Sequence, residues 1–497
     1  MTDVLPPQNF RLYRTEQIRQ LEHLAITELH LSGYELMQRA GIASWHWLQQ
    51  SWPGIHKLVV VCGGGNNAGD GYAIATIARK SGKQVIVLAL RPVESLQAEA
   101  LQAARNFQQQ GGKVKPFDAD ELQQADVIVD AILGIGLERE VSGDLQECIQ
   151  AINQSGKPVF AVDVPSGLNA NTGRVMGAAI RANFTLSFIG RKQGLYTGSS
   201  ADYCGVHQCE DLDLPHSIID RVVPSAYLLD RQTTVSDLPK RQRTAHKGHF
   251  GHLLVIGGDY GYAGAVRMCA EMAARSGVGL VSIATRAEHA QMIPLARPEL
   301  MAAGVASAAN LVPLLHSASV LAIGPGLGHS DWSTALLAKV LDTQIPMVVD
   351  ADGLNLLAQD PARRDNWVLT PHPGEAARLL GISVAEVEAD RFAAARLIQH
   401  RYGGVIVLKG SGTIVVDSAG QVSVCSGGNS GMASGGMGDV LTGLIAGLMC
   451  QQLSTGNAAR LAVCIHAEAA DIVATQTGER GLLATDLIPI VRQLLNS

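Results

Sequence analysis

The sequence predicts an α/β protein with two units, of which the first is doubly wound, and three observations support this prediction. Short, nearly continuous apolar runs alternate with glycine turns and helical patterns, as in KLVVVCGGGNNAGDGYAIATIARKSG and HLLVIGGDYGYAGAVRMCAEMAARSG. Such runs are typical of parallel strands that are covered on both faces. The 53 glycines and a charged fraction of 17% fit tightly turned domains rather than a disordered chain. The length of 497 residues exceeds that of one ordinary domain.

The first half of the chain carries the first α/β unit. From about residue 57, strand-like runs recur in KQVIVLAL, ADVIVDAILGIG and KPVFAVDVPSGLNA. Ahead of them, residues 15–50 show one or two amphipathic helical patterns, which would flank the sheet. Residues 210–246 then carry prolines and charges but few periodic apolar positions. We therefore expect a domain boundary near residue 222, which gives the units 1–222 and 223–497.

The second half repeats this rhythm with its own strands and helices. Apolar runs recur in VGLVSIAT, SVLAIGPGLG, PMVVDADGLNLLA and GGVIVLKGSGTIVVD. The two halves share only this general α/β style, and the sequence contains no short-period repeat or low-complexity tract. The predicted fold class is therefore α/β in both units.

Composition limits the class of partner. A net charge of −6 and the lack of a long Lys/Arg block argue against nucleic acid or an acidic membrane surface and favour small molecules. The eight cysteines include no CxxC pair, so we expect them to be reduced and mostly buried. The first residues lack the basic end and apolar run of a signal peptide, and no segment approaches 18 uninterrupted apolar residues. We expect a soluble, cytoplasmic protein.

Glycine-rich and polar segments follow the strands of the second half. They are GPGLG (324–328), DADGLN (350–355), TPHPGE (370–375), KGSGT (409–413) and SGGMGDVLTG (434–443). Ligands of open α/β sheets bind beyond the carboxyl ends of strands, where these segments should lie. Each segment alone has a structural explanation: a tight turn, Asp352 as a helix cap, Glu375 as a first-turn acid, or a hairpin turn at KGSGT. Their presence at one sheet end favours a shared ligand site.

The last of these segments ends in one aspartate at the start of an apolar helix. Glycines allow a ligand to approach the backbone closely, and a helix start offers unpaired N–H groups and a positive dipole end. Such a place attracts anions such as phosphate. Asp439 could instead be a plain N-cap of this helix.

A glycine-rich turn also opens a helix in the first half. GGGNNAGDGYAIA (63–75) follows a strand, so its N–H groups could hold a phosphate. It is not GxGxxG in the ordinary register, which weakens the interpretation as a hydride-transferring dehydrogenase. The next two strands end in Asp130 and Asp163, and Asn67, Asp130 and Ser166 could supply oxygen ligands to a hard cation. Alternatively, each aspartate caps the turn after its strand.

The order of GGDYGYAGA, GPGLG, TPHPGE, KGSGT and GGMGDVLTG resembles the ribokinase-like superfamily, specifically its branch of ADP- or ATP-dependent NAD(P)H-hydrate dehydratases. The resemblance covers about residues 228–495. It implies a ribokinase-like α/β fold that binds ADP with Mg²⁺ and a nicotinamide cofactor that has gained water at C6. Phosphoryl transfer from ADP would activate the C6 hydroxyl and leave AMP, and loss of phosphate would restore the ring double bond.

The same resemblance implies roles for individual residues. Asp439 would be the general base for the substrate hydroxyl, while Gly436 and Gly438 would let phosphate approach. The hydrated ring would lie by Ala263, Gly326 and His372, although His372 could also be a buried, satisfied histidine. The nucleotide would be lined by Lys409, Gly410, Ser411, Gly412 and Thr413.

The set NNAGD, DAILGIGLERE and DVPSG resembles the NAD(P)H-hydrate epimerase family over about residues 10–218. It implies a Rossmann-like doubly wound fold that interconverts the two C6 epimers of the hydrate. Potassium would be bound by Asn67, Asp130 and Ser166, and Asp163 would do the acid–base work. Contacts to the cofactor would come from Asp163 and from Asn66, Asn67, Ala68, Gly69, Asp70, Gly134, Ile135, Gly136, Leu137, Glu138, Arg139 and Glu140.

Together, the two resemblances imply a bifunctional repair enzyme that epimerises the R and S forms of NAD(P)H hydrate and dehydrates the S form. Similar folds often form homo-oligomers, so we expect one here. Two other interpretations are open. One is an ATP-dependent kinase of a small vitamin-like alcohol, fused to a nucleotide-binding regulatory domain. In the other, the first unit is only a nucleotide-binding or protein-interaction module.

Overall fold

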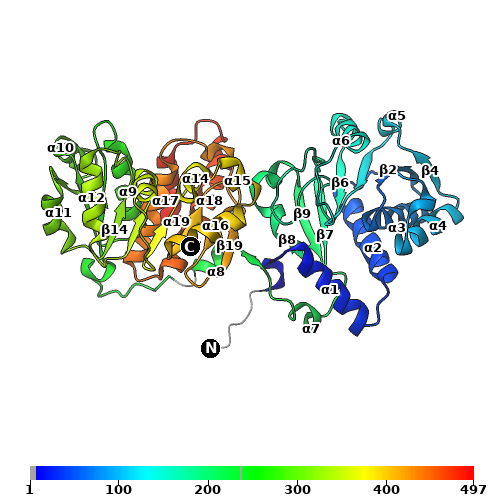
Figure 1. Ribbon diagram of the computed structural model, residues 1–497, viewed down its shortest axis with the longest axis horizontal. Helices are drawn as coiled ribbons and strands as arrows, with labels where there is room; N and C mark the ends of the chain where they lie inside the picture. Colours follow the sequence, from blue (N-terminus) through cyan, green and yellow to red (C-terminus); the bar gives the residue numbers. More distant parts are fainter. Residues whose placement is uncertain (1–6, 236–237) are drawn as a thin grey trace. The chain divides into compact units, whose positions relative to one another are not determined.

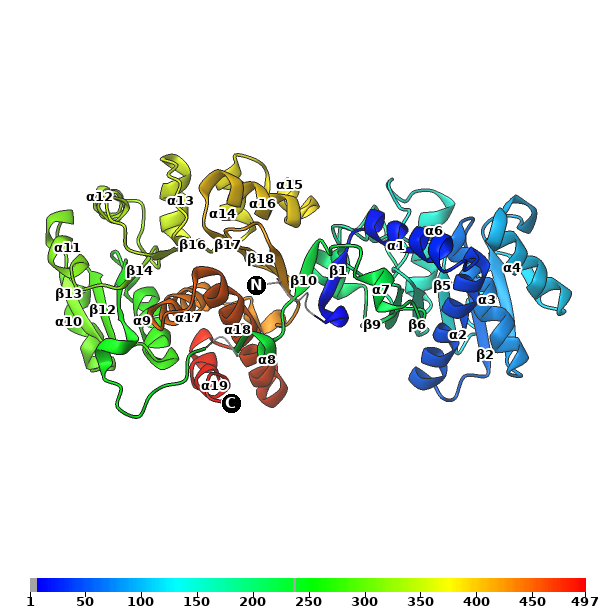
Figure 2. The same ribbon diagram turned by 90° about the horizontal axis from the view of Figure 1, so that it is seen from below.

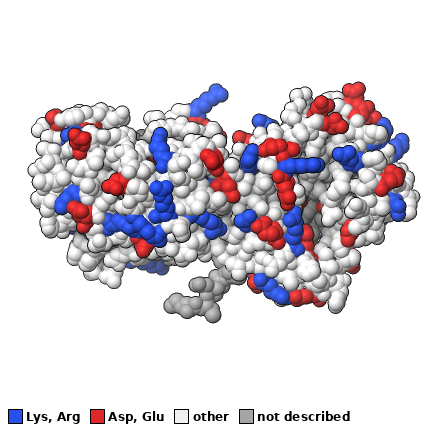
Figure 3. Space-filling view, viewed as in Figure 1, with Lys and Arg blue, Asp and Glu red and all other residues white. Residues whose placement is uncertain are grey.

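A computed structural model describes residues 7–235 and 238–497 of the chain. These residues form two compact units, Met1–Tyr227 and Leu228–Ser497 (Figure 1). Both are α/β, as the sequence predicts. On the face drawn in Figure 3, acidic and basic side chains occur on each unit. Among the described residues, no helix has the length and apolar character needed to span a membrane.

The first unit is built on a parallel sheet with the strand order β4-β3-β2-β5-β6-β7-β9. The order reverses between β2 and β5, which is the switch point where doubly wound sheets bind ligands. The strands are β2 (Lys57–Cys62), β3 (Gln84–Ala89), β4 (Lys113–Pro116), β5 (Val127–Ala131), β6 (Val159–Val162), β7 (Phe184–Phe188) and β9 (Val206–Glu210).

Helices cover both faces of this sheet because side chains alternate along each strand. Leu58 and Val60 pack with helices α1 to α4, whereas Val59 and Val61 pack with α6 on the opposite face. The helices are α1 (Thr15–Glu28), α2 (Gly33–Ser51), α3 (Asn66–Lys80), α4 (Ala98–Gln109), α5 (Ala119–Leu122), α6 (Asp144–Gln154) and α7 (His216–Ile219). The two predicted N-terminal helices are thereby confirmed as α1 and α2.

Short elements complete the first unit. Strand β1 (Arg11–Tyr13) pairs in parallel with β8 (Arg191–Lys192) and antiparallel with β10 (Ala226–Leu228). The 3-10 helices are η1 (Gln8–Phe10), η2 (Val93–Ser95), η3 (Gln193–Tyr196) and η4 (Gly198–Asp202).

The sheet of the second unit runs in the order β13-β12-β11-β14-β15-β16-β17-β18-β19. It is parallel from β13 to β17 and ends in an antiparallel pair of hairpins. The strands are β11 (His252–Ile256), β12 (Leu280–Thr285), β13 (Met301–Gly304), β14 (Val320–Ile323), β15 (Met347–Val349), β16 (Trp367–Leu369), β17 (Val405–Leu408), β18 (Thr413–Val416) and β19 (Val422–Cys425).

Two helical layers cover this second sheet. Helices α9, α17, α18 and α19 share one core with the strands, and α12, α13, α14 and α16 lie on the other face (Figure 2). The helices are α8 (Arg231–Val235), α9 (Ala263–Ser276), α10 (Ala287–Ala296), α11 (Ala308–Leu315), α12 (Asp331–Leu341), α13 (Ala351–Gln359), α14 (Pro373–Leu380), α15 (Val384–Ala389), α16 (Arg391–Tyr402), α17 (Met437–Cys450), α18 (Thr455–Thr477) and α19 (Leu487–Leu494), with the 3-10 helices η5 (Lys247–Phe250), η6 (Ser430–Met432) and η7 (Ala484–Asp486).

Helices α9 and α17 approach each other closely at Gly443. A Cβ atom at Gly443 would overlap the carbonyl oxygen of Cys269 in α9. A side chain there would have to push the two helices apart, and overpacking of this kind costs about 1–3 kcal/mol. Position 443 therefore holds the start of α17 against the core.

We predict that Gly443→Ala lowers the free energy of unfolding by about 1–3 kcal/mol, measured by urea denaturation. Gly264→Ala is the matched control, because Gly264 lies in α9 with nothing within 4 Å of its added Cβ. The control should keep or slightly raise stability. Equal stability of both variants would contradict the close contact.

Candidate active sites

Asp439 lies in the first turn of α17 but does not cap that helix. The N-cap is Gly436, with a left-handed φ of 95° and no side-chain cap. The alternative that Asp439 is a plain N-cap is therefore wrong. Among the described residues, its half-buried carboxyl has no hydrogen-bond partner. Burial and the neighbouring Asp350 carboxylate raise the pKa of Asp439 to about 7.

An ion pair between a buried carboxylate and a partly exposed lysine lies beside this helix start. Asp350, at the end of β15, is 1% exposed and lies 2.6 Å from the Nζ atom of Lys409. Thr442 Oγ1 of α17 donates to the other carboxylate oxygen at 2.8 Å. Although burial opposes ionisation, Lys409 holds the pKa of Asp350 below its ordinary value. A Cβ at Gly438 would lie 3.3 Å from both charged groups, so the glycine leaves room above the pair.

The start of helix α14 faces the same lysine. The His372 side chain accepts a hydrogen bond from Gly374 N at 2.9 Å, and Glu375 accepts one from His372 N at 2.8 Å. Glu375 is thus the first-turn acid that the sequence predicts. Its Oε2 lies 3.8 Å from Lys409 Nζ, and burial raises its pKa to about 7. The His372 side chain is 51% exposed, so the alternative of a buried histidine is wrong.

The GPGLG and DADGLN segments are joined by a hydrogen bond to Asp352. Helix α13 has Asp350 as its N-cap residue, so the expectation that Asp352 is the helix cap is wrong. Asp352 instead accepts a hydrogen bond from Gly328 N at 2.9 Å, and its negative charge helps to raise the pKa of Asp439. The GPGLG turn also packs on the start of α9, because a Cβ at Gly326 would lie 2.6 Å from Tyr262 Cβ, next to Ala263.

The KGSGT segment is the hairpin turn between β17 and β18, as predicted. Within it, Thr413 Oγ1 donates to the Gly410 carbonyl at 3.0 Å. Gly410 and Gly412 have left-handed φ values of 138° and 64°. The turn thus combines the paired ammonium of Lys409 with backbone that only glycine adopts easily.

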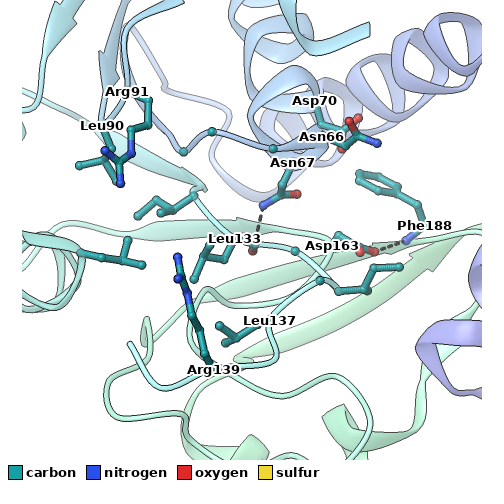
Figure 4. Close-up of a pocket in the computed structure, with 18 of the residues that line it drawn as sticks. Asn66, Asn67, Asp70, Leu90, Arg91, Leu133, Leu137, Arg139, Asp163 and Phe188 are labelled. Carbon is teal, nitrogen blue, oxygen red and sulfur yellow. Dashed lines mark hydrogen bonds between the residues drawn. The ribbon is translucent and has the colours of Figure 1, made fainter. Parts of the chain in front are cut away.

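The first unit contains a cavity of about 620 Å³ beyond the carboxyl ends of its strands (Figure 4). It lies at the switch point, between the turn after β2 and the loop after β5. The predicted residues that line it are Asn66, Asn67, Asp70, Gly134, Ile135, Gly136, Leu137, Arg139 and Asp163. Ala68, Gly69, Glu138 and Glu140 are not part of its lining. Gly69 faces helix α2 instead, because a Cβ there would touch Met37, and Glu140 pairs with Arg174.

Asp163 is held in place by donors from other elements. Its Oδ1 atom accepts a hydrogen bond from Phe188 N at 3.1 Å and pairs with the ammonium of Lys192. Its φ of 67° is unusual for a residue other than glycine, and such strain is concentrated at functional sites. These donors do not belong to the turn after β6, so the simple turn-cap interpretation is wrong for Asp163.

Two further carboxyls line the cavity near Asp163. Burial, together with repulsion from Asp163 and Glu22, raises the pKa of Asp70 well above its usual range. Burial also raises the pKa of Glu22. Sequence reasoning missed Glu22 and Lys192. Lys192 is 1% exposed, and its only sequence signal is a basic residue after an apolar strand.

Asn67, Asp130 and Ser166 meet around Leu133. The fully buried Asp130 accepts hydrogen bonds from Ser166 N at 2.8 Å and from Ser166 Oγ at 2.5 Å, and burial raises its pKa to about 6. Asn67 Nδ2 donates to the Leu133 carbonyl at 3.0 Å. Asp130 also accepts from Ile132 N, so it does help to cap its turn. A buried carboxylate without a cationic partner among the described residues, surrounded by neutral oxygens, suits a hard cation.

The fold and the two sites define a two-domain α/β enzyme with acid–base groups at the strand ends of both units. A family model described as NAD(P)H-hydrate dehydratase matches residues 253–493, and one described as YjeF-related protein N-terminus matches residues 33–194. The bifunctional NAD(P)H-hydrate repair enzyme Nnr of Coxiella burnetii is 51% identical, covering 98% of this chain and 99% of that protein. The chain therefore belongs to the family of bifunctional NAD(P)H-hydrate repair enzymes.

Other relatives agree with this assignment. The repair enzyme Nnr of Escherichia coli is 42% identical, covering 98% of this chain and 94% of that protein. A crystal structure of a ribokinase-like superfamily protein from Enterococcus faecalis is 28% identical, covers 54% of this chain and 95% of that chain, and gives a TM-score of 0.50. Both predicted resemblances are confirmed. The repair enzyme is favoured over the kinase with a regulatory domain.

Proposed function

We propose that the chain restores hydrated NADH and NADPH, with unit 1 as the epimerase and unit 2 as the ADP-dependent dehydratase of the S form. Family membership supports the pair of activities. The observation that carries the second activity is Asp439, a carboxyl without a hydrogen-bond partner among the described residues. It lies at a helix start that follows a glycine N-cap, beside the partly buried Lys409. A cytoplasmic location and a homo-oligomeric state stay predictions.

In unit 2, Asp439 takes the proton of the C6 hydroxyl while the hydroxyl oxygen attacks the terminal phosphorus of ADP. AMP leaves, the C6–O bond then breaks with release of phosphate, and transfer of the C5 proton to the departing phosphate restores the ring double bond. A pKa of about 7 suits a base at neutral pH. The N–H groups at the start of α17 and the Lys409 ammonium are placed to stabilise the phosphoryl charge.

Mg²⁺ would accompany the nucleotide and neutralise part of the charge on its phosphates. The described residues contain no group of three or more His, Cys, Asp or Glu that could hold a metal ion by themselves. The nucleotide phosphates would therefore supply most of the ligands. ADP is the donor in this proposal, and AMP is its product.

In unit 1, Asp163 takes the proton of the C6 hydroxyl while the C6–N1 bond opens to an aldehyde and N1 is protonated. N1 then attacks the other face of that carbonyl, loses its proton, and Asp163 returns a proton to the oxygen, which gives the other epimer. Lys192 and Phe188 N hold the Asp163 carboxylate in one orientation. Asn66 and Asp70 contact polar groups of the cofactor, and Gly134 and Gly136 let it approach the backbone. K⁺ would be held by oxygens of Asn67, Asp130 and Ser166. It would balance the buried Asp130 charge and stiffen the loop that begins at Leu133.

A racemic C6 hydrate of NADH tests both activities, followed by the absorbance of the reduced nicotinamide. With ADP, the wild type should recover all of the NADH, because the stranded epimer is converted. With Asp163→Asn, the recovery of NADH should stop near half, because only the S form is dehydrated. Asp439→Asn should lose about 10²- to 10⁴-fold in the rate of recovery, because the base is gone.

Each variant provides the control for the other. Asp439→Asn should still interconvert the epimers, and Asp163→Asn should still dehydrate the S form, which shows that both are folded. The assay is kept within a time in which the hydrate alone does not epimerise. Rapid recovery by Asp439→Asn would contradict its role as the base.

The dehydratase rate should depend on the ionisation of Asp439, whose pKa is about 7. Below this pH the carboxyl is protonated and cannot accept a proton, so kcat/KM should fall about tenfold per pH unit and level off above it. Glu375 has a similar pKa, so Glu375→Gln is the control. If the inflection in the pH profile of kcat/KM disappears in Glu375→Gln, the titrating group is Glu375 and not Asp439.

Removal of K⁺ should lower epimerisation. After exchange into a tetramethylammonium buffer, the rate should fall about tenfold or more and recover with KCl, because Asp130 loses its counter-ion. Asp130→Asn should not respond to KCl. The control is Asp126→Asn, at a surface carboxylate that accepts from the His56 and Lys57 N–H groups, and it should respond like the wild type. A rate that is independent of the cation would exclude the site.

A further inference from the structure

The carboxyls and the arginines labelled in Figure 4 lie in different parts of the cavity of the first unit, which Arg19, Lys192 and Asp144 also line. Asp70, Asp163 and Phe188 lie together on the right of Figure 4, whereas Arg91 and Arg139 lie on the left, with their guanidinium groups turned toward a common space. The acid–base groups of the proposed epimerase therefore occupy one part of the cavity, and the arginines occupy another. A bound dinucleotide would meet two different environments along its length.

Arg91 lies at the position that contacts the adenosine ribose in dinucleotide-binding sheets. It follows β3, the strand that neighbours β2, and Leu90 N still donates to Cys62 O at 3.0 Å. The Arg91 side chain thus stands beside the glycine turn, with its Cγ 3.3 Å from the Cβ that Gly64 would carry. In such sheets, an acid at this place binds the adenosine 2′-hydroxyl, whereas an arginine accommodates a 2′-phosphate.

The second arginine comes from a different loop. Arg139 belongs to the loop after β5 and lines the same cavity. Both side chains are exposed, and neither has an ion-pair or hydrogen-bond partner among the described residues. Two guanidinium groups without an acidic partner match the planar, bidentate recognition of phosphate oxygens.

We infer that Arg91, assisted by Arg139, binds the 2′-phosphate of NADPH hydrate, so that unit 1 epimerises NADPH hydrate in preference to NADH hydrate. This inference rests on the proposed function of unit 1. The nicotinamide ring then lies by Asp163, and the adenosine end lies by the arginines. The glycine turn between them faces the pyrophosphate.

The test measures epimerisation by the full chain without added nucleotide, so that the dehydratase is idle. The R and S forms of each hydrate are separated by chromatography. The wild type should have the higher kcat/KM with NADPH hydrate. Arg91→Ala should lower that value about tenfold or more through KM, because a charge-assisted hydrogen bond is lost. The same substitution should change kcat/KM for NADH hydrate by no more than about twofold, since that substrate lacks the phosphate.

Charge reversal and a competitor sharpen the test. Arg91→Glu should reverse the preference toward NADH hydrate. Adenosine 2′,5′-bisphosphate should inhibit the wild type more strongly than AMP, and the two should inhibit Arg91→Ala equally. Arg105→Ala is the control, because Arg105 is an exposed arginine of α4 that does not line this cavity, and it should keep the wild-type preference.

The outcomes separate the inference from the proposed function. An equal loss with both hydrates would place Arg91 on the shared pyrophosphate and overturn the inference, as would an unchanged preference in Arg91→Ala. Either result would leave the epimerase activity standing. A wild-type chain that epimerises neither hydrate would overturn the proposed function of unit 1 itself.

Discussion

The ion pair between the buried Asp350 and the partly exposed Lys409 is the interaction on which the second site depends. It joins the end of β15 to the turn after β17, and Thr442 fixes α17 to the same carboxylate. Removal of one partner from such a pair costs about 3–5 kcal/mol, because the other charge remains out of water. The pair also sets the chemistry beside it. Burial and the Asp350 charge raise the pKa of Asp439, and Lys409 offsets only part of that effect.

The first unit also pairs a lysine with a carboxylate beside a second carboxyl, at the strand ends of its own sheet. Lys192 is buried against Asp163, and a second carboxyl, Asp70, lies close enough for its pKa to rise. In unit 2, Lys409 lowers the pKa of Asp350 in spite of burial, while burial raises the pKa of the neighbouring Asp439. In unit 1, Lys192 pairs with Asp163, while burial raises the pKa of the neighbouring Asp70. Carboxyls whose environments push their pKa values apart can divide the acid and base roles of a reaction between them. Counted along the chain, the strands of both sheets follow the order 3-2-1-4-5-6-7, so the two sites share this topology as well as the pairing of a lysine with a carboxylate.

The sequence predicts the fold class, the strands and most of the segments that line the two sites, because those features are local. Apolar periodicity identifies a strand such as β2, and a glycine run before an apolar helix identifies the start of α17. Contacts between distant segments are not local. Nothing near Lys192 indicates its pairing with Asp163, and the choice between Asp350 and Asp352 as the helix cap depends on a difference of two residues in where α13 begins. Exposure of His372 likewise follows from tertiary packing.

The two proposed catalytic aspartates differ in how firmly they are held, and the difference suits their reactions. Asp439 has no hydrogen-bond partner among the described residues, so its lone pairs are open to the hydroxyl that arrives with the substrate. A base that acts in one direction needs only that opening and a pKa near the working pH. Epimerisation is reversible, so the same carboxyl must take and return a proton in one fixed geometry. Lys192 and Phe188 N supply that geometry, and burial raises the pKa of Asp70 nearby.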